Sequence, residues 1–160
     1  MPKNRKDWKM SDNTCLHATL VKLQSKGVLL IGKSGSRKSD LALRMIENKA
    51  ATLVADDAVF ISRQGNALYG TAAENLRGML EVRGVGIVKY PYLKRAKIDL
   101  VVRLTENAAA VGRLPVAHSE VILGLEIKQI DLYAKENSAP DKIAAALRLF
   151  NVCEQTGVSC

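Results

Sequence analysis

The feature that most restricts how this chain can fold is a small polar loop between an apolar run and a helical pattern. The run 28–31 (VLLI) is short and wholly apolar, which is typical of a central β-strand covered on both faces. Residues 32–39 (GKSGSRKS) follow directly. Apolar residues then recur at helical spacing over 41–46, which predicts a helix that begins near Lys38. Strand, glycine-containing loop and helix in this order predict a site for phosphate groups at the helix N-terminus.

The loop is similar to the nucleotide-phosphate motif Gly-x-x-x-x-Gly-Lys-Ser/Thr. Lys38 would reach the β- and γ-phosphates of ATP, and the Ser39 hydroxyl would bind Mg²⁺. Arg37 stands where the motif has its second glycine, and its bulk predicts a weakened nucleotide affinity. A basic loop without a ligand is the alternative interpretation of this imperfect motif. The residues expected to bind the nucleotide are Gly32, Lys33, Ser34, Gly35, Ser36, Arg37, Lys38 and Ser39.

Two acidic residues end the next predicted strand. Residues 52–55 form an apolar run, and Asp56 and Asp57 follow it directly. In phosphoryl-transfer proteins, carboxylates near the phosphate loop hold the metal ion and position the nucleophile. Taken alone, an Asp pair is more often a turn or a helix cap, and the neighbouring phosphate loop favours the functional interpretation.

Three further features have an ordinary structural interpretation when each is taken alone. Residues 81–89 (EVRGVGIVK) combine two charges with two glycines, which is compatible with a simple bend. His17 lies on a predicted strand over 15–23, where a histidine is usually a satisfied core residue. Arg113 follows a predicted loop and would by default be a solvated surface charge.

Taken together, these residues resemble the catalytic, C-terminal domain of the bacterial HPr kinase/phosphorylase family. Residues 80–88 (LEVRGVGIV) are close to the family signature LEIRGLGII. His17 lies fifteen residues before Gly32, as the active-site histidine of the family precedes its loop, and 53–57 (LVADD) resembles its strand ending in two aspartates. The resemblance implies an α/β, phosphate-loop (P-loop) kinase-like fold with a mixed, strand-rich sheet. We expect residues 14–160 to form one catalytic domain of the short form that lacks the N-terminal domain, and 1–13 to be a basic disordered arm.

The resemblance implies an ATP- and Mg²⁺-dependent serine kinase that phosphorylates HPr, the phosphocarrier of the sugar phosphotransferase system. It places the nucleotide phosphates on Lys38 and Mg²⁺ on Ser39 and Glu81. Asp57 would be the proton acceptor, with Asp56 as the alternative because this chain is one residue longer between loop and pair. His17 and Arg113 would complete the active site. The family is usually a homo-hexamer.

The family pattern is incomplete in one further region. Its late Pro- and Arg-containing loop, tied to the phosphorylase direction, has no clear equivalent in 126–140. We therefore predict kinase activity rather than phosphorylase activity. A degenerate regulatory pseudo-kinase, which binds a partner without turnover, is the alternative hypothesis, and Arg37 is the residue that separates the two.

The net charge allows a further class of function. The chain has 24 Lys and Arg against 16 Asp and Glu, a formal net charge of +8, which favours an anionic partner. Aromatic residues, which stack on bases, make up only 4% of the chain, and the basic residues are spread along it. We therefore expect no nucleic-acid partner.

Membrane insertion and secretion are not expected either. No run approaches the roughly 18 apolar residues of a membrane span, and the N-terminus has no apolar segment. Three cysteines, an odd number without metal-ligand spacing, are typical of a reducing compartment. The expected location is the cytoplasm.

Overall fold

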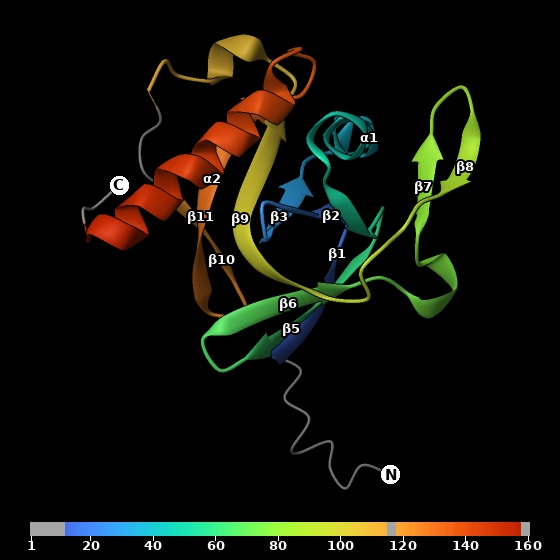
Figure 1. Cartoon of the computed structure of the whole chain (residues 1–160), viewed down its shortest axis with the longest axis horizontal. Coiled ribbons are helices and arrows are strands. Elements are labelled where there is room, and N and C mark those ends of the chain that lie inside the picture. The colour runs from blue at the N-terminus through green and yellow to red at the C-terminus, as the bar shows by residue number, and fades with distance from the viewer. Residues whose placement is uncertain (1–11, 115–117, 158–160) are drawn as a thin grey trace, which may run out of the picture.

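The computed structural model describes residues 12–114 and 118–157 of the chain (Figure 1). Most of the arm predicted over 1–13 lies outside the described residues. Asn13 already begins the first strand, so the ordered domain starts before the predicted boundary at residue 14. None of the described helices is long and apolar enough to cross a membrane.

The described residues form an α/β fold with a mixed, strand-rich sheet, as predicted. The two helices are α1 (Lys38–Lys49) and α2 (Ala139–Thr156), and short 3-10 turns occur at Glu74–Leu76 and Ala108–Ala110. The strands are β1 (Asn13–Leu16), β2 (Ala18–Leu23), β3 (Lys26–Ile31), β4 (Thr52–Ala55), β5 (Val59–Gln64), β6 (Ala67–Thr71), β7 (Met79–Val82), β8 (Gly86–Lys89), β9 (Ala96–Thr105), β10 (His118–Ile122) and β11 (Leu125–Tyr133).

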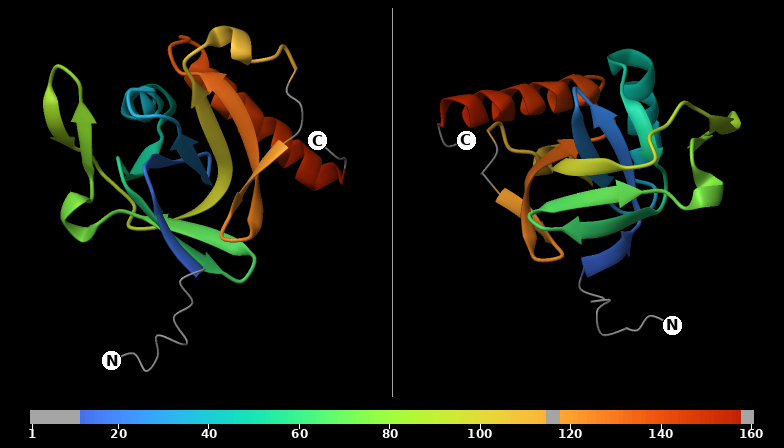
Figure 2. Two further views of the ribbon diagram at one scale, coloured as in Figure 1. Left: turned by 180° about the vertical axis from the view of Figure 1, so that it is seen from behind. Right: turned by 60° about the horizontal axis from the view of Figure 1, so that its bottom comes forward.

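The long strand β9 joins the two parts of the main sheet. Its first residues pair antiparallel with β6, and its later residues pair parallel with both β3 and β11. The order along the sheet is β1-β5-β6-β9-β3-β2-β4, with β10 and β11 branching from β9. Because β9 changes partners along its length, β1, β5 and β6 curl away from the helices (Figures 1 and 2). The strands β7 and β8 form a separate hairpin.

The central strand β3 is covered on both faces, which is why its sequence is apolar over 28–31. Val28 and Leu30 belong to a core shared with α1 and α2. Leu29 belongs to a second core shared with β5, β6 and β10. All three side chains are fully buried, so each face of the sheet has its own hydrophobic core.

The structure differs from the sequence-based expectations for two strands and for one cysteine. The strand predicted over 15–23 is interrupted at His17, which separates β1 from β2. The sequence also predicts one strand over 121–132, but these residues belong to the β10–β11 hairpin, because Leu123 and Gly124 adopt positive φ values of 50° and 79° and turn the chain. Cys153 is disulfide-bonded, which the number and spacing of the cysteines did not predict.

Candidate active site

Sheet topology brings the candidate residues to one edge. Both β3 and β4 run antiparallel to β2, which lies between them, so the C-terminal ends of β3 and β4 meet at the same edge. The phosphate loop 32–39 leaves β3 at this edge, and the Asp56–Asp57 pair leaves β4 there. The N-terminal end of β2 also lies at this edge, which adds Thr19 and the preceding His17.

Lys38 is enclosed by the loop that carries it. Its side chain is buried, at 6% exposure, and its Nζ donates hydrogen bonds to the main-chain oxygens of Gly32 (2.9 Å) and Lys33 (3.1 Å). Burial lowers the pKa of Lys38 from its ordinary value, while the negative charges of Asp57 and Asp56 act in the opposite direction. The loop therefore places a positive charge at the N-terminus of α1, where the helix dipole adds to it.

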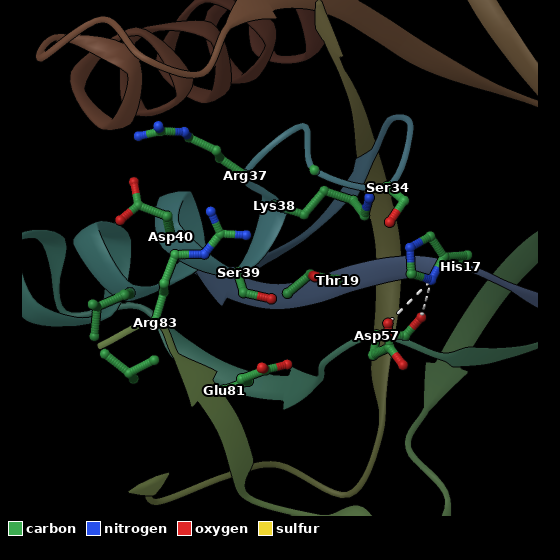
Figure 3. A pocket seen from close by; sticks show the side chains of 13 residues that line it. His17, Thr19, Ser34, Arg37, Lys38, Ser39, Asp40, Asp57, Glu81 and Arg83 are labelled. Carbon is green, nitrogen blue, oxygen red and sulfur yellow. Dashed lines mark hydrogen bonds and ion pairs between the residues drawn. The ribbon is translucent and has the colours of Figure 1, made fainter. Parts of the chain in front are cut away.

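Arg37 has a left-handed backbone conformation, with φ 70° and ψ 37°. Such a conformation is natural for the glycine that the motif expects and costly for a residue with a Cβ. The side chain is exposed and extends away from Ser34 and His17 (Figure 3). It forms no hydrogen bond or ion pair with the described residues. The departure from the motif therefore appears as backbone strain at the start of α1, while the side chain lies at the rim of the pocket.

The two aspartates have different surroundings. Asp56 accepts hydrogen bonds from the hydroxyls of Ser39 (2.7 Å) and Thr19 (3.0 Å), and from the backbone N–H of Glu81 at 3.4 Å. Thr19 is fully buried, so its hydroxyl is held towards Asp56 by packing. Asp56 thus joins the loop, β2 and β7, and its carboxylate is occupied by three donors from the protein.

The carboxylate of Asp57 is exposed to the pocket. Its Oδ1 lies 3.1 Å from Nδ1 of His17, and its side chain is 77% exposed (Figure 3). The same ring nitrogen lies 3.0 Å from the main-chain oxygen of Asp57, and Ala18 donates to that oxygen as well. Asp57 has a φ of 68°, which turns the chain between the two aspartates. The His17 ring therefore fixes the orientation of Asp57 and leaves one carboxylate oxygen accessible.

A pocket of about 300 Å³ lies between the loop, the strand ends and β7 (Figure 3). It brings together most of the predicted residues and five residues that were not predicted as site residues, of which four are Thr19, Asp40, Leu43 and Val82. Arg83, from the signature segment, also lines the pocket. The predicted residues that line it are His17, Ser34, Gly35, Arg37, Lys38, Ser39, Asp57 and Glu81.

Some predicted site residues do not line this pocket. Gly32, Lys33 and Ser36 line a neighbouring pocket of about 640 Å³ on the other side of the loop. Arg113 is exposed and lines neither pocket. Residues 126–140 form β11, a connecting turn and the start of α2, and none of them lines the 300 Å³ pocket. Thr19 had one signal in the sequence, because it is a polar residue between apolar neighbours in a buried strand.

Comparisons with a family model and with individual relatives identify the same family. The family model described as "HPr Serine kinase C-terminal domain" matches residues 8–157. The HPr kinase/phosphorylase of Mycoplasma genitalium is 32% identical over 137 residues, which are 86% of this chain and 38% of the relative. That of Alkaliphilus metalliredigens is 39% identical over 132 residues, 75% of this chain and 42% of the relative. The chain therefore spans about two fifths of the length of these relatives.

A solved structure supports the same fold. The Hpr(Ser) kinase/phosphatase from Coxiella burnetii superposes with a TM-score of 0.79. The similarity covers 89% of this chain and 93% of the other, at 22% sequence identity.

Proposed function

This chain belongs to the HPr serine kinase C-terminal domain family, and on that premise we propose that it transfers the γ-phosphoryl group of ATP to a serine of HPr. The observation that carries this proposal is one pocket in which a phosphate loop faces an accessible carboxylate, Asp57. The overall change is ATP plus a serine hydroxyl giving ADP and phosphoserine.

The loop supports ATP as the phosphoryl donor. Lys38 carries its charge inside the loop, and the N-terminus of α1 points its unpaired N–H groups to the same place. Phosphate oxygens would therefore meet donors that are already in position, so little reorganisation is needed when they bind. ADP would leave with the bridging oxygen that had joined the β- and γ-phosphates.

The side chains at the pocket also fit Mg²⁺. Among the described residues, no three His, Cys, Asp or Glu side chains are grouped to hold a metal ion by themselves. This suits Mg²⁺, which is commonly held by one or two carboxylates together with substrate phosphates. Ser39 and Glu81 would hold it, and Asp56 would orient the Ser39 hydroxyl. When bound, Mg²⁺ would neutralise part of the phosphate charge.

The different partners of the two aspartates support Asp57 as the general base. Asp56 already accepts three hydrogen bonds, whereas among the described residues the carboxylate of Asp57 pairs only with His17 and faces the pocket. Asp57 would accept the serine proton while the serine oxygen forms its bond to the γ-phosphorus. His17 would position the carboxylate. Arg113 has no role in this proposal, because it lies outside the pocket lining.

The test is a phosphorylation assay with HPr, Mg²⁺ and γ-labelled ATP. We expect labelled phosphoserine on HPr that depends on both Mg²⁺ and ATP. Asp57→Asn keeps the shape of the side chain but removes the proton acceptor, so the rate should fall by about 10²–10⁴-fold. Calorimetric ATP affinity should be largely retained. Asp141→Asn, an exposed substitution on α2, is the matched control and should leave the rate unchanged.

Three results would change this assignment. Turnover that is lost in Asp56→Asn but kept in Asp57→Asn would move the base role to Asp56. A wild-type protein that binds HPr but never phosphorylates it would favour the regulatory pseudo-kinase. Formation of pyrophosphate and HPr from phosphoserine-HPr and inorganic phosphate, without net phosphorylation, would assign the phosphorylase direction. We also propose a homo-hexamer, which light scattering of the purified protein would test.

A further inference from the structure

The hairpin of β7 and β8 presents two apolar side chains beside the active-site pocket. Val85 is 75% exposed and Ile87 is 71% exposed, although most large apolar side chains of the described chain are buried. The hairpin stands apart from the main sheet (Figure 1). Scattered apolar residues are common on protein surfaces, but a pair on one short hairpin at the rim of a pocket indicates a contact with a partner.

Cross-strand register places one of these side chains on the face of the hairpin that lines the pocket. Ile87 pairs directly with Glu81, and directly opposed residues of an antiparallel pair project from the same face. Glu81 lines the pocket, as does Arg83 at the end of the same strand. Ile87 therefore lies directly beside Glu81, where a molecule bound at the pocket can contact it.

The hairpin is held in place from its opposite face. Leu80 is fully buried in the core shared with α1 and α2, and Val82 packs against the same core. At the tip, Gly84 and Gly86 have φ values of 86° and 129°, and a Cβ built on either would meet no atom within 4 Å. The tip is therefore open, and its apolar side chains are carried by an anchored element.

The hairpin also carries two cations, Arg83 and Lys89, besides the carboxylate of Glu81. Arg83 and Lys89 flank the two apolar side chains, and neither forms an ion pair or a hydrogen bond with the described residues. Their charges are free to meet carboxylates of a partner. Two apolar side chains between two cations suit a polypeptide segment that has apolar residues and at least one acidic residue.

We propose that Arg83, Val85, Ile87 and Lys89 form a docking face for the protein substrate, next to the serine that is phosphorylated. This inference rests on the proposed function, because it assigns the partner of the same pocket. The docked segment would have apolar side chains against Val85 and Ile87 and a carboxylate near Lys89. Continuity with the pocket favours a substrate over a second copy of the chain.

The test compares steady-state kinetics with HPr as the probe. In Val85→Ser/Ile87→Ser, the KM for HPr should rise about tenfold or more, with kcat and the Kd for ATP unchanged. Lys89→Glu should also raise this KM, and its effect should shrink at high salt, where charges are screened. Val121→Ser is the matched control: Val121 is 60% exposed on β10 and lines neither pocket, so its KM should equal that of the wild type.

Other outcomes separate this inference from the proposed function. An active wild type whose KM is unchanged in Val85→Ser/Ile87→Ser would overturn the docking face and leave the kinase assignment intact. A wild type without HPr phosphorylation would refute the kinase assignment. Calorimetric HPr binding would then decide on the docking face, since loss of binding in the double variant supports it and equal or absent binding overturns it. A double variant that loses oligomeric mass would make the face a contact between copies instead.

Discussion

The left-handed backbone at Arg37 makes Arg37→Gly the most informative single substitution in the phosphate loop. For a residue with a Cβ, this conformation destabilises the folded state by about 1–2 kcal/mol. Glycine avoids this cost, but it loses about 0.5–1 kcal/mol more backbone entropy on folding, which offsets part of the gain. The exposed Arg37 side chain has no hydrogen bond or ion pair to lose in the part of the chain that the structure describes. We therefore expect Arg37→Gly to raise the free energy of unfolding by about 0.5–1 kcal/mol, or the Tm by about 2 °C.

Urea unfolding of the purified chain would measure this difference, and two variants act as controls. Arg37→Ala removes the charge and keeps the Cβ, so it should give no gain. Ala50→Gly relieves a second left-handed residue, with φ 56°, at the other end of α1 and should give a gain of similar size. If Arg37→Ala stabilises as much as Arg37→Gly, charge and not backbone strain is the cause, and the reasoning fails.

The same variant tests the nucleotide affinity. Because the guanidinium extends away from Ser34 and His17, removing it should change the Kd for ATP by less than about fivefold, the effect of an exposed charge. A much tighter Kd in calorimetry would show that the side chain does crowd the phosphates. A much weaker Kd would make Arg37 a phosphate ligand.

Three further predictions concern the fold and its charges. Because burial lowers the pKa of Lys38 in the folded protein, the unfolded chain binds more protons just below pH 10.5, and stability relative to Lys38→Met should rise with pH up to that value. Denaturation of both proteins across pH 8–10 would test this prediction. A difference in the free energy of unfolding that does not change with pH would contradict it. Thr19→Val removes a donor to Asp56, so Mg²⁺-dependent ATP affinity should fall in calorimetry while the Tm changes little; an unchanged affinity would argue against this role. Gly70→Ala places a Cβ 2.5 Å from Leu20 Cδ2 and should lower the free energy of unfolding, measured with urea, by about 1–3 kcal/mol. An unchanged free energy of unfolding would mean that the core rearranges to accommodate the methyl group.

The sequence by itself was sufficient for the features that depend on neighbouring residues. The apolar run before the loop and the periodicity after Lys38 are local signals, and β3 and α1 were found where predicted. The signature segment identified the family, which the match over 8–157 confirms. Local steric and hydrogen-bonding preferences act over a few residues, so these features can be read without knowing the rest of the fold.

Only the tertiary structure decided which groups meet. Ser39 contacts Asp56 across 17 positions, Thr19 contacts Asp56 across 37, and His17 contacts Asp57 across 40. These contacts exist because β2 lies antiparallel between β3 and β4, an arrangement that buries both faces of the sheet and that no short segment specifies. The same packing leaves Arg113 outside the pocket lining and turns the signature segment into a hairpin. Pairing and burial are properties of the whole sheet, so the division of roles between the two aspartates became visible only once the strands had been assembled.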